Sequence, residues 1–224
     1  MTVYRTRRPI TALPSFVTTT TARGRLAAIA ALLLLPLAAC TGSAPNGSQA
    51  DIDGTVHVCS SCHGLDGKSI NPTFPRLAGQ QKDYLVAQLT AFRGKTRADP
   101  HAHTYMWGMA ARLSDATIDG VATYFSALPP AVGSPGDPKE MEAGKKIFTE
   151  GIEAENIPAC MACHGDKAQG QGEIPRLAGQ HKEYMRGQIE AFAENSRANE
   201  IMHENAMHLT PPEIVAVTTY LSAQ

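Results

Sequence analysis

Two copies of a five-residue motif, Cys-x-x-Cys-His, stand about a hundred residues apart in this chain. Two thiols at this spacing can each bond to one vinyl group of a haem, and the histidine that follows can bind the iron. Cys-x-x-Cys alone also occurs in redox pairs and zinc knuckles, but the adjoining histidine and the repetition favour covalent haem. The alternatives are disulfides or zinc, for which each Cys₂His half-site lacks a ligand. The motif residues are Cys59, Cys62 and His63 in the first copy and Cys160, Cys163 and His164 in the second.

A haem held by one histidine has a second axial position, and the group that fills it decides the function. The closing helices of the two halves are expected to start at Ser114 and Thr210, an offset of 96 residues. Only Met106 and Met202 coincide in this alignment, so we predict that they are the second iron ligands. A methionine in an apolar setting is otherwise usually core filler. The fallback ligands are Met109 in the first half and Met207 in the second.

Histidines in the same two stretches make bis-histidine ligation the rival hypothesis. None of them coincides with another in the alignment on the helix starts, so polar loop positions are the simpler interpretation. An iron without a second ligand would instead indicate a di-haem enzyme, such as a peroxidase, and the matched methionines argue against one. The histidines concerned are His101, His103, His203 and His208.

The sequence contains an internal duplication. The block Pro-Arg-Leu-Ala-Gly-Gln occurs twice, and each copy is followed by a tyrosine, a glutamine and a phenylalanine at helical spacing. Capping signals precede both closing helices, and no segment favours a strand. We predict an all-α protein of two tandem units, each a small helical bundle around a covalent haem. The predicted divisions are a signal peptide at 1–39, a flexible tether at 40–50, a first domain at 51–130, a linker at 131–138 and a second domain at 139–224.

The N-terminal residues have the features of an export signal. Arginines but no acidic residue precede an apolar run at 26–39, which is shorter than the roughly 20 residues of a membrane span. The run ends in Leu-Ala-Ala-Cys40, similar to the lipobox of bacterial lipoproteins, so Cys40 is predicted to be lipidated. An ordinary signal peptide or an uncleaved anchor is the alternative, because the stretch before the run is long for a lipoprotein. The expected location is the periplasmic side of a bacterial membrane, through a lipid anchor, or otherwise the soluble periplasm.

Residues 40–224 are acidic, with 15 basic and 21 acidic side chains. This balance makes nucleic acid an improbable partner. The charge is uneven, since 40–137 carry 7 basic and 8 acidic residues while 138–224 carry 8 and 13. Such a dipolar molecule could be oriented before it docks on redox partners. A solvated acidic surface without a steering role explains the same composition.

These features together resemble the two-haem class I cytochromes c of the cytochrome c4 type. Three motifs each occur twice over essentially all of residues 50–224: CxxCHG, then PRLAGQ with the following tyrosine and glutamine, then methionine eight residues before the Ser or Thr that starts the last helix. The resemblance implies His and Met ligation of each iron. It also implies that the carbonyls of Pro75 and Pro175 accept hydrogen bonds from His63 and His164, which fixes the orientation of each imidazole.

The resemblance further implies outer-sphere electron transfer rather than catalysis at the iron. The partners it suggests are a quinol-oxidising complex as donor and a terminal oxidase as acceptor, or a periplasmic dehydrogenase to which the chain is a permanently docked cytochrome subunit. Arg76 and Arg176 are candidates for pairing with haem propionates, or are surface cations. One departure from the family pattern is the segment 50–58, which we expect to be less helical than its counterpart 140–149.

Overall fold

The computed structural model of the protein describes residues 45–224, which belong to one compact unit. The predicted signal peptide and residues 40–44 of the predicted tether, including Cys40, lie outside the described residues. Helices account for the regular structure, and the only bridges between extended residues in this part of the chain are isolated ones. The elements are α1 Gln49–His63, α2 Lys82–Arg93, η1 Ala102–Met106, α3 Trp107–Ala110, α4 Asp115–Ala127, α5 Pro138–Glu150, η2 Glu153–Glu155, α6 Met161–His164, α7 Lys182–Ala193, α8 Glu200–Ala206 and α9 Pro211–Ser222.

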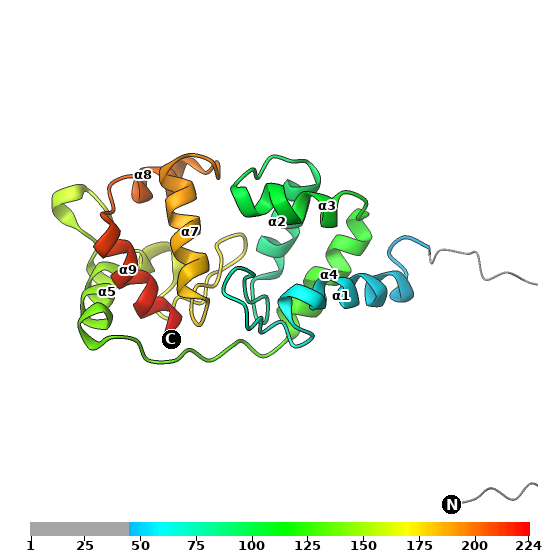
Figure 1. Ribbon diagram of the computed structural model, residues 1–224, viewed down its shortest axis with the longest axis horizontal. Helices are drawn as coiled ribbons and strands as arrows, with labels where there is room; N and C mark the ends of the chain where they lie inside the picture. Colours follow the sequence, from blue (N-terminus) through cyan, green and yellow to red (C-terminus); the bar gives the residue numbers. More distant parts are fainter. Residues whose placement is uncertain (1–44) are drawn as a thin grey trace, which may run out of the picture. The chain divides into compact units, whose positions relative to one another are not determined.

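The helices gather into two groups that follow the sequence duplication (Figure 1). We call the first group, α1 to α4, lobe 1 (residues 45–128), and the second, α5 to α9, lobe 2 (residues 137–224). The segment between them, 129–136, has no helix. For residues 45–224 the helices observed confirm the prediction of an all-α fold with two helical units. In residues 45–224 we find no helix that is both long and apolar enough to cross a membrane.

The starts of the helices follow from local side-chain chemistry. Ser114 accepts a hydrogen bond from the backbone N–H of Thr117 at the start of α4. Thr210 and Glu213 form a reciprocal capping box at the start of α9, which satisfies two backbone N–H groups that have no partner within the helix. Asp137 caps α5, and Pro138 occupies its first position, where a missing N–H costs nothing.

The prediction that residues 50–58 are less helical than 140–149 was wrong. They belong to α1, which begins at Gln49, inside the predicted tether, and continues through the first Cys-x-x-Cys-His motif. Ser48 caps the helix, and Asp51 ties it to lobe 1 by accepting a 2.6 Å hydrogen bond from the Thr117 hydroxyl of α4. Because these two contacts are made by polar side chains, they do not contribute to an apolar periodicity. The hydrophobic pattern alone therefore did not predict the helix.

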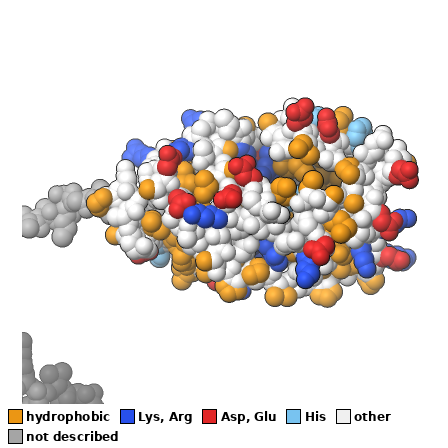
Figure 2. All heavy atoms as spheres, turned by 180° about the vertical axis from the view of Figure 1, so that it is seen from behind, with side chains coloured by type: hydrophobic (Ala, Val, Ile, Leu, Met, Phe, Trp, Pro, Cys, Tyr) orange, Lys and Arg blue, Asp and Glu red, His pale blue; other side chains and the backbone are white. Residues whose placement is uncertain are grey.

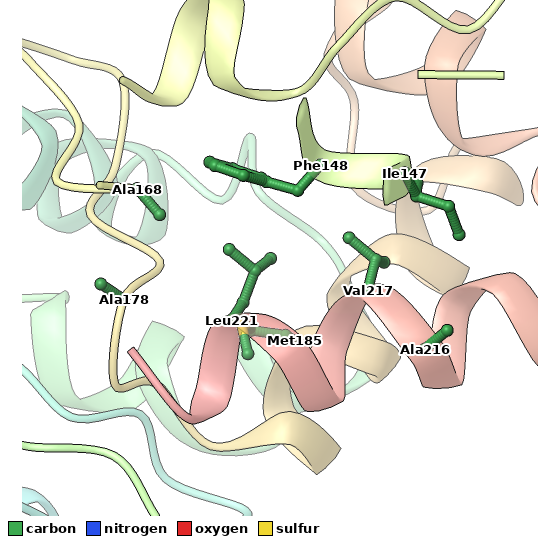
Figure 3. Packing of buried hydrophobic residues seen from close by; sticks show 8 residues of the cluster. All are labelled: Ile147, Phe148, Ala168, Ala178, Met185, Ala216, Val217 and Leu221. Carbon is green, nitrogen blue, oxygen red and sulfur yellow. The ribbon is translucent and has the colours of Figure 1, made fainter. Parts of the chain in front are cut away.

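The apolar core of lobe 2 lies between its first and last helices. Figure 3 shows Val217 and Leu221 of α9 directed toward Ile147 and Phe148 of α5, and all four side chains are buried. The backbones approach most closely at Gly144 of α5, where a Cβ would collide with the backbone of α9. Lobe 1 has an equivalent cluster, built from Val56, Leu85, Val121, Ala122 and Phe125.

Candidate functional site: a haem cavity shared by two lobes

A cavity of about 570 Å³ is lined by residues of both lobes. The histidine of each Cys-x-x-Cys-His motif, His63 and His164, lies in its wall, as do both predicted methionine ligands, Met106 and Met202. Apolar side chains make up much of the remaining lining. The helices thus bring a histidine and a methionine from each half of the sequence to one cavity.

Each motif histidine is buried and held by one hydrogen bond. His63 Nδ1 lies 2.8 Å from the carbonyl oxygen of Pro75, and His164 Nδ1 lies 3.0 Å from that of Pro175. Burial lowers the pKa of both imidazoles, and the carbonyl bond opposes this only in part. A neutral imidazole that donates from Nδ1 leaves the Nε2 lone pair available for a metal.

The residue after each histidine is a glycine for a conformational reason. Gly64 and Gly165 both have φ of +81°, a backbone conformation that side chains disfavour. The chain turns there so that the following loop returns to the proline carbonyl. This requirement explains why the sixth residue of the repeated CxxCHG motif is the same in both lobes.

The four cysteines of the described residues differ in exposure and form no disulfide with one another. Cys59, Cys160 and Cys163 line the cavity. Cys59 and Cys160 are half-buried, whereas Cys62 and Cys163 are exposed. Burial raises the pKa of Cys59 to about 11, and it also raises the pKa of Cys160. Each motif therefore has one half-buried and one exposed cysteine, with at least one of them in the cavity wall.

The two pairs of candidate methionines differ in position. Met106 ends η1 and Met202 lies in α8, and both line the cavity. Met109 and Met207 are absent from its lining and are 57% and 50% exposed. The stretches that carry Met106 and Met202 are helical, not loop-like as the sequence suggested. In lobe 2 the Asn199 side chain starts the turn by accepting a hydrogen bond from the Met202 N–H.

Of the four histidines considered for bis-histidine ligation, only His101 lines the cavity. His101 is exposed at the cavity wall, and His103 packs edge-on against Trp107. His203 Nδ1 lies 2.8 Å from the Phe192 carbonyl, and His208 is exposed. The cavity lining contains no histidine of lobe 2 other than His164.

The lobes contact each other through the repeated Pro-Arg-Leu-Ala-Gly-Gln block, a role that the sequence analysis missed. The Gln180 side chain accepts from the N–H of Arg76 and donates to its carbonyl, at 2.8 and 2.9 Å. Gln80 makes the same two bonds to Arg176, at 2.7 and 2.9 Å. The sequence signal for this contact was the glutamine that ends both copies of the block, because a contact with haem does not require a glutamine at that position.

Arg76 and Arg176 both line the cavity. The Arg76 guanidinium donates to the carbonyl of Gly179, while the buried Nε of Arg176 has no hydrogen-bond partner among the described residues. Burial lowers the pKa of Arg176, and a buried donor without an acceptor is costly. An anionic group in the cavity would satisfy it, so the residues present fit a haem with its propionates.

A second symmetric contact between the lobes uses one titratable side chain. His181 Nε2 lies 2.8 Å from the Ser69 carbonyl, and at the equivalent place Gln81 Nε2 donates to the Gln169 carbonyl at 2.8 Å. Burial and, secondly, Arg76 lower the pKa of His181 below the ordinary value of 6.5. The neutral imidazole is therefore the form that the folded protein favours.

The pH dependence of stability should change when His181 is replaced by glutamine. Below pH 6.5 the unfolded chain binds a proton that the folded imidazole resists, so wild-type stability falls as the pH is lowered toward the depressed pKa. His181→Gln copies Gln81 and keeps a donor but does not titrate. The difference in thermal midpoint between the variant and the wild type should increase from pH 7.5 to pH 5.0. An unchanged difference would contradict the assignment.

Comparison with known proteins gives the same picture. The profile of the cytochrome c family matches twice, at residues 55–129 and 141–224. Cytochrome c-552 of Acidithiobacillus ferridurans is 42% identical over 167 residues, covering 74% of this chain and 73% of that protein. A thiosulfate dehydrogenase electron acceptor of Stutzerimonas stutzeri is 34% identical over 204 residues, covering 88% and 93%. The cytochrome c4 structure from Acidithiobacillus ferrooxidans matches with a TM-score of 0.71 at 42% identity, covering 74% of this chain and 98% of that one.

The doubled motif, the helical fold and these matches define a c-type cytochrome. The chain belongs to the cytochrome c family and is a two-haem protein of the cytochrome c4 type. The prediction of two covalent haem c groups is thereby confirmed. Like its cytochrome c4 relatives, the protein is an electron carrier and not an enzyme.

Proposed function

We propose that this protein carries single electrons along a respiratory chain at the periplasmic side of a bacterial membrane, from a quinol-oxidising complex to a terminal oxidase. Cys40 supplies a lipid anchor, and the residues that follow it supply a tether. Each haem, when bound, supplies an iron that alternates between the ferric and ferrous states. The protein holds each iron closed, so that electrons enter and leave without a bound substrate.

The observation that carries this proposal is the pairing of one motif histidine and one methionine per lobe at the cavity wall. In lobe 1 the pair is His63 and Met106, and in lobe 2 it is His164 and Met202. The proline carbonyls fix the imidazoles, and the methionine thioethers would hold each iron together with its histidine. Methionine ligation raises the potential relative to two histidines, which suits a place late in an electron-transfer chain.

The absorption spectrum of the ferric holoprotein, truncated to start after Cys40, tests this closure. The weak far-red band of a Met-to-iron bond should have the intensity expected for two haems per chain. Intensity for one haem or none would reject His/Met closure at one or both irons. The open-site alternative, a peroxidase-like activity, would then take its place.

A second candidate partner is a periplasmic dehydrogenase. The observation in its favour is the relative from Stutzerimonas stutzeri that is named a thiosulfate dehydrogenase electron acceptor and matches 88% of this chain. A comparison of two electron sources separates the candidates. In one mixture, ferric holoprotein would be combined with quinol and membranes of the host bacterium. In the other, it would be combined with thiosulfate and a periplasmic extract of the same bacterium. The rate of haem reduction would be recorded in both. If the haems are reduced faster with thiosulfate than with quinol, the donor is a periplasmic dehydrogenase and not a quinol-oxidising complex.

The anchor has its own test. In cells, Cys40→Ser should move the haem-stained protein from the membrane fraction to the soluble periplasmic fraction. The spectrum should stay the same, because residue 40 lies outside the two cytochrome c domains. A variant that stays on the membrane would show that an uncleaved segment, and not a lipid, holds the protein there.

A further inference from the structure

Two arginines that are equivalent in the duplication are buried where the lobes meet. Arg97 and Arg197 are each 8% exposed and line the haem cavity. Both donate to the same two acceptors, the side-chain oxygens of Gln88 in lobe 1 and Gln188 in lobe 2. The four distances lie between 2.6 and 3.0 Å. The two guanidinium groups are therefore close neighbours that share their acceptors across the lobe contact.

Aromatic residues complete this cluster in a crossed arrangement. Arg97 donates to the Tyr184 hydroxyl of the other lobe at 3.3 Å, and Arg197 donates to that of Tyr84 at 2.9 Å. Each guanidinium also lies over a phenylalanine ring of its own lobe, at 4.7 Å for Phe92 and 4.5 Å for the equivalent ring in lobe 2. The amide acceptors are neutral, so they satisfy hydrogen bonds but do not cancel the charge. The two guanidinium groups lower the pKa of the buried Tyr84 phenol, against the opposing effect of burial.

One carboxylate offsets part of the charge of the two arginines. Asp99 is 1% exposed, and its Oδ2 accepts a 2.8 Å hydrogen bond from Arg97 Nε. Burial acts to raise the pKa of Asp99, but Arg97 and then Arg197 lower it by more, so the group is ionised at neutral pH. The equivalent residue of lobe 2 is Asn199, which is exposed and caps α8. The cluster therefore contains two guanidinium groups and one carboxylate.

On the outer face shown in Figure 2, acidic side chains lie interspersed with lysines and arginines, where water and salt screen them. Charges buried against the cavity are screened much less, so they act on the irons more strongly. An iron that gains an electron loses one unit of positive charge. A fixed cation nearby therefore favours the ferrous state and raises the potential, and a fixed anion lowers it.

We propose that the buried cluster of Arg97, Arg197 and Asp99 sets the reduction potentials of the two haems, with the arginines raising them and Asp99 lowering them. This role goes beyond electron carriage as such. It depends on the two haems that membership of the cytochrome c4 type implies, and not on the identity of the donor or acceptor. Because the carboxylate occurs in one lobe only, the cluster is also a source of inequality between two otherwise similar sites.

Spectroelectrochemical titration of Asp99→Asn tests the proposal. At least one of the two potentials should rise, with an increase of threefold or more in the equilibrium constant for haem reduction, or about 28 mV for a one-electron couple. The matched control is Asn199→Asp, which adds a carboxylate at the equivalent but exposed position. It should lower the potentials by a clearly smaller amount.

A charge cycle separates electrostatics from loss of packing. Arg197→Gln should lower the potentials, whereas Arg197→Lys, which keeps the charge, should leave them near the wild-type values. The double variant Arg97→Gln/Asp99→Asn restores the net charge of the cluster and should reverse the rise seen in Asp99→Asn. The proposal is overturned if Asp99→Asn leaves both potentials unchanged, or if Asp99→Asn and Arg197→Gln shift them in the same direction. If Asp99→Asn fails to take up haem, the arginine variants decide alone.

Discussion

Replacing Met202 by alanine should remove the far-red band of one haem and lower the potential of that haem, whereas Met207→Ala should leave both properties unchanged. Met202 lines the cavity, while Met207 does not and is 50% exposed. Axial-ligand identity moves haem potentials over a range of about 0.8 V, so loss of the thioether should cost roughly 0.1–0.3 V at that iron. The affected haem should also bind added imidazole, because its second axial position becomes accessible.

Lobe 1 provides an independent copy of the same experiment. Met106→Ala should behave like Met202→Ala, and Met109→Ala, at a residue that is 57% exposed, should behave like the wild type. The double variant Met106→Ala/Met202→Ala should have no far-red band at all. If Met109→Ala or Met207→Ala removes a band, the fallback ligand is the correct one for that lobe. Full haem content in every variant, measured after denaturation, serves as the control.

The sequence predicted the parts of the site that chemistry ties to short spacings. Cys-x-x-Cys-His is such a spacing, and the histidines that it singled out, His63 and His164, both line the cavity. The match between Met106 and Met202 came from the duplication, since two equivalent residues at equivalent distances from a helix start are seldom both incidental. The ligand assignment itself stays a prediction until the spectra are measured.

The contact between the lobes could not be predicted from the hydrophobic pattern of the sequence. It joins residues about a hundred positions apart, such as Gln80 and Arg176, and no local periodicity reports on such a pairing. The signal that existed was repetition: Arg97 and Arg197 recur at the same offset, 100 residues, as the two PRLAGQ blocks. Repeated polar residues without an obvious role at the haem were candidates for this interface. The helicity of α1 was missed for a similar reason, because its polar anchors lie outside its apolar pattern.

Gly144→Ala should destabilise lobe 2 strongly, although the substitution favours helix formation in general. The added Cβ would collide with the carbonyl oxygen of Ala216 and approach the Cβ of Tyr220 on α9. Backbone cannot rotate away as a side chain can, so α5 and α9 must separate. Overpacking of this kind costs about 1–3 kcal/mol. At about 4–8 °C per kcal/mol for a domain of this size, the thermal midpoint should fall by roughly 10 °C.

Two other helical glycines separate this packing effect from helix propensity. A Cβ at Gly187 of α7 would meet nothing within 4 Å, so Gly187→Ala should stabilise the protein by roughly 0.5–1 kcal/mol. Gly120 of α4 faces the side chain of Ile52, which can change rotamer, so Gly120→Ala should fall between the two. Thermal unfolding of the ferric holoproteins, followed by circular dichroism, gives this ranking. If Gly144→Ala is as stable as Gly187→Ala, the α5–α9 crossing has room for a methyl group, and the glycine is not what sets the distance between these helices.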